Sequence, residues 1–294
     1  MRKQPTFVEW AHHTIIILFL GISLCTQSAF AGLPEGIPGS RAAAMGNTGV
    51  SIVDIWSVFN NQAGLAYLDY PSIGLHHENR FISPDLSFSA LGFVYPVKPG
   101  TFGLSVKRLG FTEFSQTKAG LAYGMKLAPR FSAGVQINMH NINASGVYGQ
   151  TSAFSVEAGL HYTPSKNLSV GVHVVNPSRS KIYDDERIPT IFNLGIAYKL
   201  GEKVILTGAA EKNLDVDPNF KAGLEYSPIN NLFFRTGFST NPSLLSFGLG
   251  YNYRGLQFDF AFSKHQYLGY TPQVSLSYIF GAKSANAVSE PKLP

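Results

Sequence analysis

The sequence lacks three features that would point to common classes of protein. Its single cysteine, Cys25, lies in a segment expected to be removed, so the mature chain would have no disulfide, no thiol nucleophile and no thiolate metal site. Charged residues make up only 14% of the chain, against about 25% in ordinary soluble domains. Without Arg2, Lys3 and Glu9 of that segment, 21 basic and 17 acidic residues leave a net charge of +4, too small and too dispersed to indicate nucleic-acid binding.

A long apolar run is also missing. Residues 14–25 form an apolar run of 12, which is short of the roughly 20 residues that cross a bilayer as a helix. Arg2 and Lys3 precede this run, and Ala29-Phe30-Ala31 follows it with small residues at the cleavage spacing. We therefore predict a signal peptide over residues 1–31 and a mature start at Gly32. A lipoprotein reading at Cys25 is weaker, because Leu24 stands where a small residue is expected.

What the chain has instead is two-residue alternation, from about residue 72 to residue 280. In residues 116–127, Thr117, Leu121 and Tyr123 fall on one face, while Lys118 and Gly120 fall on the other. A period of two indicates β-strands. The apolar face is rich in Leu, Val and Phe, and the other face is rich in glycine and charge. A soluble sandwich also alternates, so the pattern alone leaves open which face is inside.

Turn lengths favour a membrane barrel over a sandwich. Tight connections at residues 96–100, 128–130, 164–167, 201–202, 227–231 and 254–255 alternate with longer polar ones at residues 79–85, 110–115, 142–151, 176–189, 213–218, 240–243 and 265–271. Short periplasmic turns and longer external loops are typical of outer-membrane barrels. Six turns and seven loops join 14 strands. The first two strands and residues 203–213 alternate poorly, so 12 or 16 strands remain open.

A tyrosine recurs near the short-turn end of every second strand. Such a row at one height is typical of an aromatic girdle at the headgroups, and a sandwich gives no reason for it. The last strand ends in Tyr278-Ile279-Phe280, like the aromatic-terminated strand recognised by the outer-membrane insertion machinery. The seven girdle residues are Tyr95, Tyr123, Tyr162, Tyr198, Tyr226, Tyr251 and Tyr278. We therefore predict an all-β fold, a closed transmembrane antiparallel β-barrel of about 14 strands in the bacterial outer membrane.

The segment before the barrel does not alternate. Residues 41–46 favour a helix, residues 51–59 are compatible with a short helix, and residues 60–66 are rich in turn residues. Because residues 51–59 include Trp56 and Phe59, we expect this segment to pack as a hatch in a barrel wide enough to need filling. The predicted organisation is a signal peptide at 1–31, a hatch at 32–70, a barrel at 71–280 and a flexible tail at 281–294.

Two motifs in the hatch resemble a known family. Residues 39–50 read GSRAAAMGNTGV, and residues 61–65 read NQAGL. They are similar to the G-x-R-x-x-x-M-G-x-x-G-V and N-P-A-G-L motifs of PorV/PorQ-like outer-membrane proteins of Bacteroidetes, relatives of FadL-like fatty-acid transporters. Gln62 replaces the proline of the second motif. The hatch-motif residues are Arg41, Met45, Gly46, Gly49, Asn61, Gln62, Ala63 and Gly64.

The resemblance implies a 14-stranded barrel with its N-terminal segment inside. It also implies one of two functions: movement of hydrophobic compounds across the outer membrane, or service in type IX secretion as a component that binds cargo or partner subunits. The 263-residue mature chain is short for a secretion shuttle. The expected partners are outer-membrane lipid and either a hydrophobic small molecule or secretion-system proteins, with no cofactor and no nucleic acid.

The polar strand face supplies the candidate lumen residues. His140, His161 and His173 lie on consecutive strands near Glu157, with Ser155 and Ser169 close by, so an outer-membrane hydrolase is a third hypothesis. Polar lumen faces more often form hydrogen-bond networks, and we predict no enzyme and no catalytic residue. The lumen-facing candidates are Lys118, His140, Glu157, His161, His173, Lys199, Glu225, Arg235 and Asp259.

Three further sets of residues do not indicate a functional site. His76 and His77 are adjacent on a strand and point to opposite faces, so they cannot bind one metal together. The acidic run at residues 184–186 reads as a solvated loop tip. Asn143-Ala144-Ser145 matches a glycosylation sequon, which has little meaning in a bacterial outer membrane. We predict no metal site.

Overall fold

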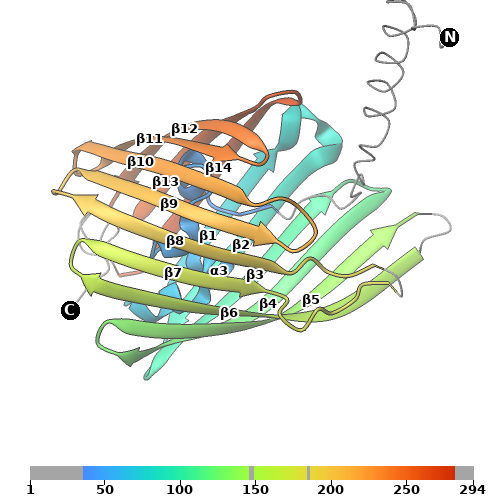
Figure 1. Ribbon diagram of the computed structural model, residues 1–294, viewed down its shortest axis with the longest axis horizontal. Helices are drawn as coiled ribbons and strands as arrows, with labels where there is room; N and C mark the ends of the chain where they lie inside the picture. The colour runs from blue at the N-terminus through green and yellow to red at the C-terminus, as the bar shows by residue number, and fades with distance from the viewer. Residues whose placement is uncertain (1–35, 146–148, 184–185, 282–294) are drawn as a thin grey trace, which may run out of the picture. The chain divides into compact units, whose positions relative to one another are not determined.

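A computed structural model describes residues 36–145, 149–183 and 186–281 (Figure 1). Some predictions fall outside these ranges: the signal peptide with Cys25 and the start at Gly32, Asp184-Asp185 of the acidic loop, and the tail beyond residue 281. Within the described ranges no helix is long and apolar enough to cross a membrane.

The described chain forms a closed barrel of 14 antiparallel strands, which confirms the predicted fold and strand count. Every strand pairs with its sequence neighbours, and β1 pairs with β14 from Ser72↔Ile279 to Glu78↔Gln273. The strands are β1 (Ser72–Asn79), β2 (Ser87–Pro96), β3 (Gly100–Gly110), β4 (Phe114–Ala128), β5 (Phe131–Ala144), β6 (Gly149–Ser165), β7 (Leu168–Val175), β8 (Ile191–Leu200), β9 (Val204–Asn213), β10 (Asn219–Ile229), β11 (Leu232–Thr240), β12 (Ser243–Tyr253), β13 (Leu256–His265) and β14 (Gly269–Ile279).

The apolar strand face points outward and the glycine-and-charge face points into the lumen. Leu121 is 54% exposed, Val135 57% and Phe258 46%, whereas their chain neighbours Gln136 and Asp259 are almost fully buried. A soluble sandwich would have buried the first three. This inverted arrangement suits a barrel whose outer face meets lipid, because closure leaves no free sheet edge.

The predicted alternation of short and long connections holds only in part, because several of the expected loops are as short as the turns. Only Asn241-Pro242 separates β11 from β12, and β5 and β6 run past the expected loop boundaries, so Asn143 pairs with Gln150 inside the sheet. The side chains at these strand ends are polar, but the ladder is made by backbone N–H and C=O groups. The hairpin can therefore extend past the boundary expected from the side-chain pattern. The β1–β2 connection holds two 3₁₀ turns, η3 (Arg80–Ile82) and η4 (Pro84–Leu86).

The segment before β1 forms four short elements: α2 (Ser40–Ala44), η1 (Gly49–Ser51), α3 (Ser57–Asn60) and η2 (Gln62–Tyr67). We call residues 36–67 the hatch. The helix expected at residues 51–59 is confined to α3, and the run expected to be a turn is the 3₁₀ helix η2. Trp56, Val58 and Leu65 of the hatch form an apolar core with Val94 and Ala122 of the wall.

Candidate functional site

The hatch contacts nearly the whole inner wall. Element α2 packs on β11 to β14, η1 on β7 and β8, α3 on β2 and β3, and η2 on β3 to β6. In Figure 1 the hatch helix α3 is seen among the wall strands β1, β2 and β3. The candidate site is therefore the interface between hatch and lumen wall.

Glycines on the lumen face let the hatch backbone approach the wall. A Cβ added at Gly134 would meet the backbone of Gln62 and Ala63, and one at Gly237 would meet the backbone of Met45 and Gly46. Gly46 itself has a φ of +69° and lies against the β11 backbone, so a side chain there is disfavoured twice. The glycine-rich face is thus shaped to the hatch.

A charged cluster holds the α2 end. The Arg41 guanidinium donates to both oxygens of Glu225 at 2.7 and 2.9 Å. Arg235 donates to Glu225 at 2.6 Å and to Asp259 at 2.6 Å, and Gln257 also donates to Asp259 at 2.7 Å. Signs alternate along this chain of buried groups, so each charge has an opposite neighbour.

Asp54 of the hatch lies at the edge of this cluster. Its carboxylate is 3.6 Å from the Arg41 guanidinium and accepts a hydrogen bond from the Trp56 N–H at 2.9 Å. Burial raises the pKa of the Asp54 carboxyl, against the lowering effects of Arg41 and of the Trp56 N–H. Asp54 is therefore a weaker partner for Arg41 than Glu225 is.

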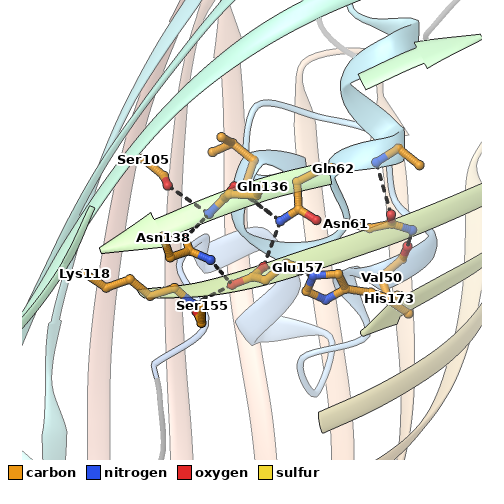
Figure 2. Close-up of polar contacts among 12 residues, drawn as sticks. Val50, Asn61, Gln62, Ser105, Lys118, Gln136, Asn138, Ser155, Glu157 and His173 are labelled. Atoms are coloured by element: carbon orange, nitrogen blue, oxygen red, sulfur yellow. Dashed lines mark hydrogen bonds and ion pairs between the residues drawn. The ribbon is translucent and has the colours of Figure 1, made fainter. Parts of the chain in front are cut away.

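A second cluster, centred on Glu157, holds the η2 end (Figure 2). One Glu157 oxygen accepts from Lys118 and from Asn138 at 3.1 Å. The other accepts from the Gln62 side chain at 2.9 Å and lies 3.0 Å from His173 Nε2. Gln62, the residue that replaces the proline of the resembling motif, is thus the hatch's direct link to this buried carboxylate.

The remaining hatch-motif residues each have a structural contact. Asn61 donates to the carbonyls of Val50 at 2.9 Å and Leu160 at 3.0 Å, and Ala63 accepts from Ser132 at 2.8 Å. Gly49 lies against Asn60 and Gly64 against Ser57, where a methyl group would collide. Met45 abuts Gly223. The motif therefore describes how the hatch fits the barrel.

The three candidate histidines have different described partners. His140 Nε2 lies 2.7 Å from Ser155 Oγ, whereas Glu157 contacts His173. His161 stacks edge-on against Tyr67, with its Nε2 3.4 Å from the Ser51 carbonyl. The serine and the carboxylate therefore contact different imidazoles, and a nucleophile needs both on one. Lys199 is partly buried, while the other eight lumen candidates are buried.

Adjacent His76 and His77 lie on opposite faces, one buried and one exposed. Among the described residues, no group of three or more histidine, cysteine or acidic side chains could hold a metal ion.

A small cavity of about 60 Å³ opens beside the hatch near the β6–β7 turn. Its apolar lining includes Ile52 and Val53 of the hatch and Ile205 of the wall. Lys166, Lys199 and Arg41 also reach it. At this cavity the hatch and the wall are not in contact, so the lumen is not completely filled there.

Several hatch contacts were not expected from the sequence. Thr48 and Thr207 hydroxyls are 2.6 Å apart, and Ser40 and Ser275 hydroxyls are 2.8 Å apart. Gln136, Asn138 and Ser105 extend the Glu157 cluster along β5 and β3. Alternation places all the wall members on the lumen face, but small polar residues are common there, so no signal in the sequence distinguished them.

These features define a class: a closed 14-stranded barrel of the outer-membrane type with an N-terminal hatch in its lumen. The chain is structurally similar to the toluene transporter TbuX of Ralstonia pickettii, with a TM-score of 0.63 and 12% identity over 82% of this chain and 97% of that one. A FadL homologue of Pseudomonas aeruginosa gives 0.64 and 12% over 85% and 100%, and the toluene transporter TodX of P. putida gives 0.60 and 13% over 84% and 98%. At such identities the likeness establishes the fold.

By sequence alone the chain matches no known family profile and no curated protein. Two of these structures are named toluene transporters and the third a FadL homologue, so the shared fold agrees with the barrel that the FadL side of the resemblance implies. The PorV/PorQ likeness, the type IX alternative and the absence of catalysis stay predictions.

Proposed function

We propose that this protein is an outer-membrane barrel that binds or passes a hydrophobic ligand, with the hatch as its gate. Support comes from the outward apolar face, which suits lipid, and from the fold shared with TbuX and TodX, named toluene transporters. In this proposal residues 1–31 are removed on export, and the girdle tyrosines lie at the headgroups of the inner leaflet.

The observation that carries the proposal is how the hatch is held. Its described links to the wall are side-chain hydrogen bonds, ion pairs and packing, and no hatch residue belongs to a strand of the sheet. Part of the hatch can therefore shift without opening the barrel. The cavity beside Ile52 and Val53 places apolar hatch surface next to the wall, where a displaced segment would expose a path for an apolar solute.

The candidate residues then take roles in the gate. Arg41, with Glu225, Arg235 and Asp259, fastens the α2 end. Gln62, with Glu157, Lys118 and His173, fastens the η2 end. His140, His161 and Lys199 line the lumen around these fastenings.

Locking the hatch tests the gate. We expect the double substitution Thr48→Cys/Thr207→Cys to form a disulfide between hatch and β9, because the parent hydroxyls are 2.6 Å apart. Uptake of an apolar naphthalene dye is measured in bacterial cells that express the protein in an intact outer membrane. Oxidation should reduce dye entry to that of cells without the protein, and a thiol reductant should restore it.

A matched control places the same bond within the wall. Ser246 and Ser263 hydroxyls are 3.0 Å apart on β12 and β13, also facing the lumen. The pair Ser246→Cys/Ser263→Cys should leave dye entry unchanged on oxidation. Undiminished entry through the locked hatch would refute the gate, and no entry through the unmodified protein would refute passage of this ligand class.

A further inference from the structure

The outward face of β1 to β4 carries an unexpected row of polar side chains. One residue per strand contributes, in direct register: His77 opposite Ser89, Ser89 opposite Arg108, and Arg108 opposite Thr117. All four point to the outer side and are exposed or partly exposed. On the girdle side they adjoin outward apolar residues such as Leu75, Leu91 and Val106, and in the other direction the row continues in register through Asn141 of β5 and Ser152 of β6.

The row lies toward the loop-side ends of its strands, within the height of the apolar belt. Ser89 and Thr117 are six residues from the girdle residues Tyr95 and Tyr123 of their own strands. At about 3.3 Å per residue and a tilt of about 40°, that is roughly 15 Å, within a belt about 25 Å tall. At the same spacing from Tyr198, Tyr226 and Tyr251 the outer face shows exposed Phe192, Phe220 and Leu245.

A cleft opens on this row. Its volume is about 440 Å³, and it lies over β2 and β3 beside the loop that follows β3. Arg108 is the one charged side chain in its described lining, and the structure gives Arg108 no hydrogen bond or ion pair with any described residue. The cleft is lined by Ser87, Ser89, Arg108, Gly110, Phe111 and Thr112.

The cleft is closed toward the lumen. The β2–β3 ladder is continuous from Phe88↔Leu109 to Pro96↔Thr101, without a register shift. An occupant beside Ser89 and Arg108 therefore lies on the outward face of the wall. Below it on the same face, exposed Leu91, Leu104 and Val106 form an apolar track toward the girdle.

Chemistry restricts the occupant. An arginine within the apolar part of a bilayer is costly and is usually paired with another group. The planar guanidinium suits the oxygens of a phosphate, which it can bind through two parallel N–H donors. Of the hydroxyls that line the cleft, that of Thr112 is a further donor for such oxygens, whereas the Ser87 hydroxyl donates to the Pro84 carbonyl at 2.9 Å and the Ser89 hydroxyl lies 3.0 Å from His77 Nδ1.

We propose that this cleft binds an anionic, phosphate-bearing lipid of the leaflet on the long-loop side, because its described lining holds one cation, Arg108, and no carboxylate to pair with a choline. Arg108 contacts the phosphate, the Thr112 hydroxyl donates to one of its remaining oxygens, and an acyl chain follows Leu91 and Val106. The inference rests on the membrane location proposed above and is independent of what passes the hatch.

Binding is tested by native mass spectrometry of the full-length protein released from detergent micelles. The probes are dioleoyl phosphatidate, dioleoyl phosphatidylcholine and glycerol 3-phosphate, which carries the phosphate without acyl chains. We expect one phosphatidate to bind preferentially and Arg108→Gln to weaken it about tenfold or more, as the loss of a charge-assisted contact predicts. The matched variant Lys264→Gln, an outward cation that lies over the Tyr270 ring, should change binding less than twofold.

Equal loss in both variants, or none in Arg108→Gln, would overturn the proposal; the second result would mean that Arg108 extends past the cleft to the headgroup layer. Equal binding of phosphatidylcholine, or competition by glycerol 3-phosphate at the concentration of the lipid, would also overturn it. A separate flotation assay with phosphatidylcholine vesicles tests membrane insertion itself. Failure to float would refute the proposed location, whereas flotation without an Arg108 effect would refute only the lipid site.

Discussion

The two ends of the hatch are fastened by different chemistry. At α2 the hatch supplies a charge, since Arg41 is one of two guanidiniums that share Glu225. At η2 it supplies a neutral amide, because Glu157 already has Lys118 as its counter-ion. Withdrawing α2, with Arg41 and Asp54, would leave two wall carboxylates facing one arginine, whereas withdrawing η2 would leave a complete ion pair. The comparison indicates that the electrostatic cost of opening is lower at the η2 end.

The largest expected effect follows from Arg41→Ala. This substitution leaves Glu225 and Asp259 with Arg235 alone, and breaking a buried pair costs about 3 to 5 kcal/mol. Urea unfolding of the protein in lipid vesicles measures the loss. Arg41→Lys, which keeps the charge without the two-pronged contact, should lose less. A loss below about 1 kcal/mol for Arg41→Ala would contradict the importance assigned to the charge at α2.

An intermediate effect is expected from Gln62→Ala. Glu157 keeps Lys118, Asn138 and His173 as partners, so the cost is that of one hydrogen bond to a charged group, about 1.5 to 3 kcal/mol. The same unfolding assay applies. If Gln62→Ala proved more damaging than Arg41→Ala, the ranking of the two ends would be reversed.

The smallest expected effect is the difference in stability between two substitutions of Gln62, to proline and to alanine. Gln62→Pro also removes the amide, but Asn61 before it is extended, with φ −172° and ψ 104°, as a residue before proline prefers. Gln62 is the first residue of η2, where proline is tolerated. We therefore expect Gln62→Pro to be about 0.4 to 1 kcal/mol more stable than Gln62→Ala, through a less flexible unfolded chain. The reverse order would show that the η2 backbone cannot accommodate the ring.

Sequence reasoning predicted the wall better than the hatch. Alternation identifies which face each strand residue occupies, and turn spacing counts strands, so the closed barrel of 14 followed from residues such as Leu121 and Lys118. The hatch elements are each six residues or fewer, too short for a periodic pattern, and their shape comes from contacts with the wall. That is why η2 was expected to be a turn.

The candidate site was predicted in part for the same reason. The two-residue alternation of the strands placed Glu157, Glu225 and Arg235 in the lumen, and the motif resemblance singled out Arg41 and Gln62. Neither could pair them, because which wall residue meets which hatch residue depends on how the hatch sits in the barrel. The polar row with Ser89 and Arg108 could be detected in the sequence, because both residues fall on the apolar face of their strands. The cavity beside the hatch and the cleft on the outer face could not be detected there.

The seam between the first and last strands adds a temporal consequence. Ser275 of β14 accepts a hydrogen bond from the Ser40 backbone N–H and contacts the Ser40 hydroxyl, so the last strand of the barrel touches the first helix of the described chain. The cylinder closes where β1 meets β14, beside that contact. A chain whose hatch is misplaced would therefore lack this contact when β1 pairs with β14. Closure of the barrel thus depends on correct placement of the hatch inside it.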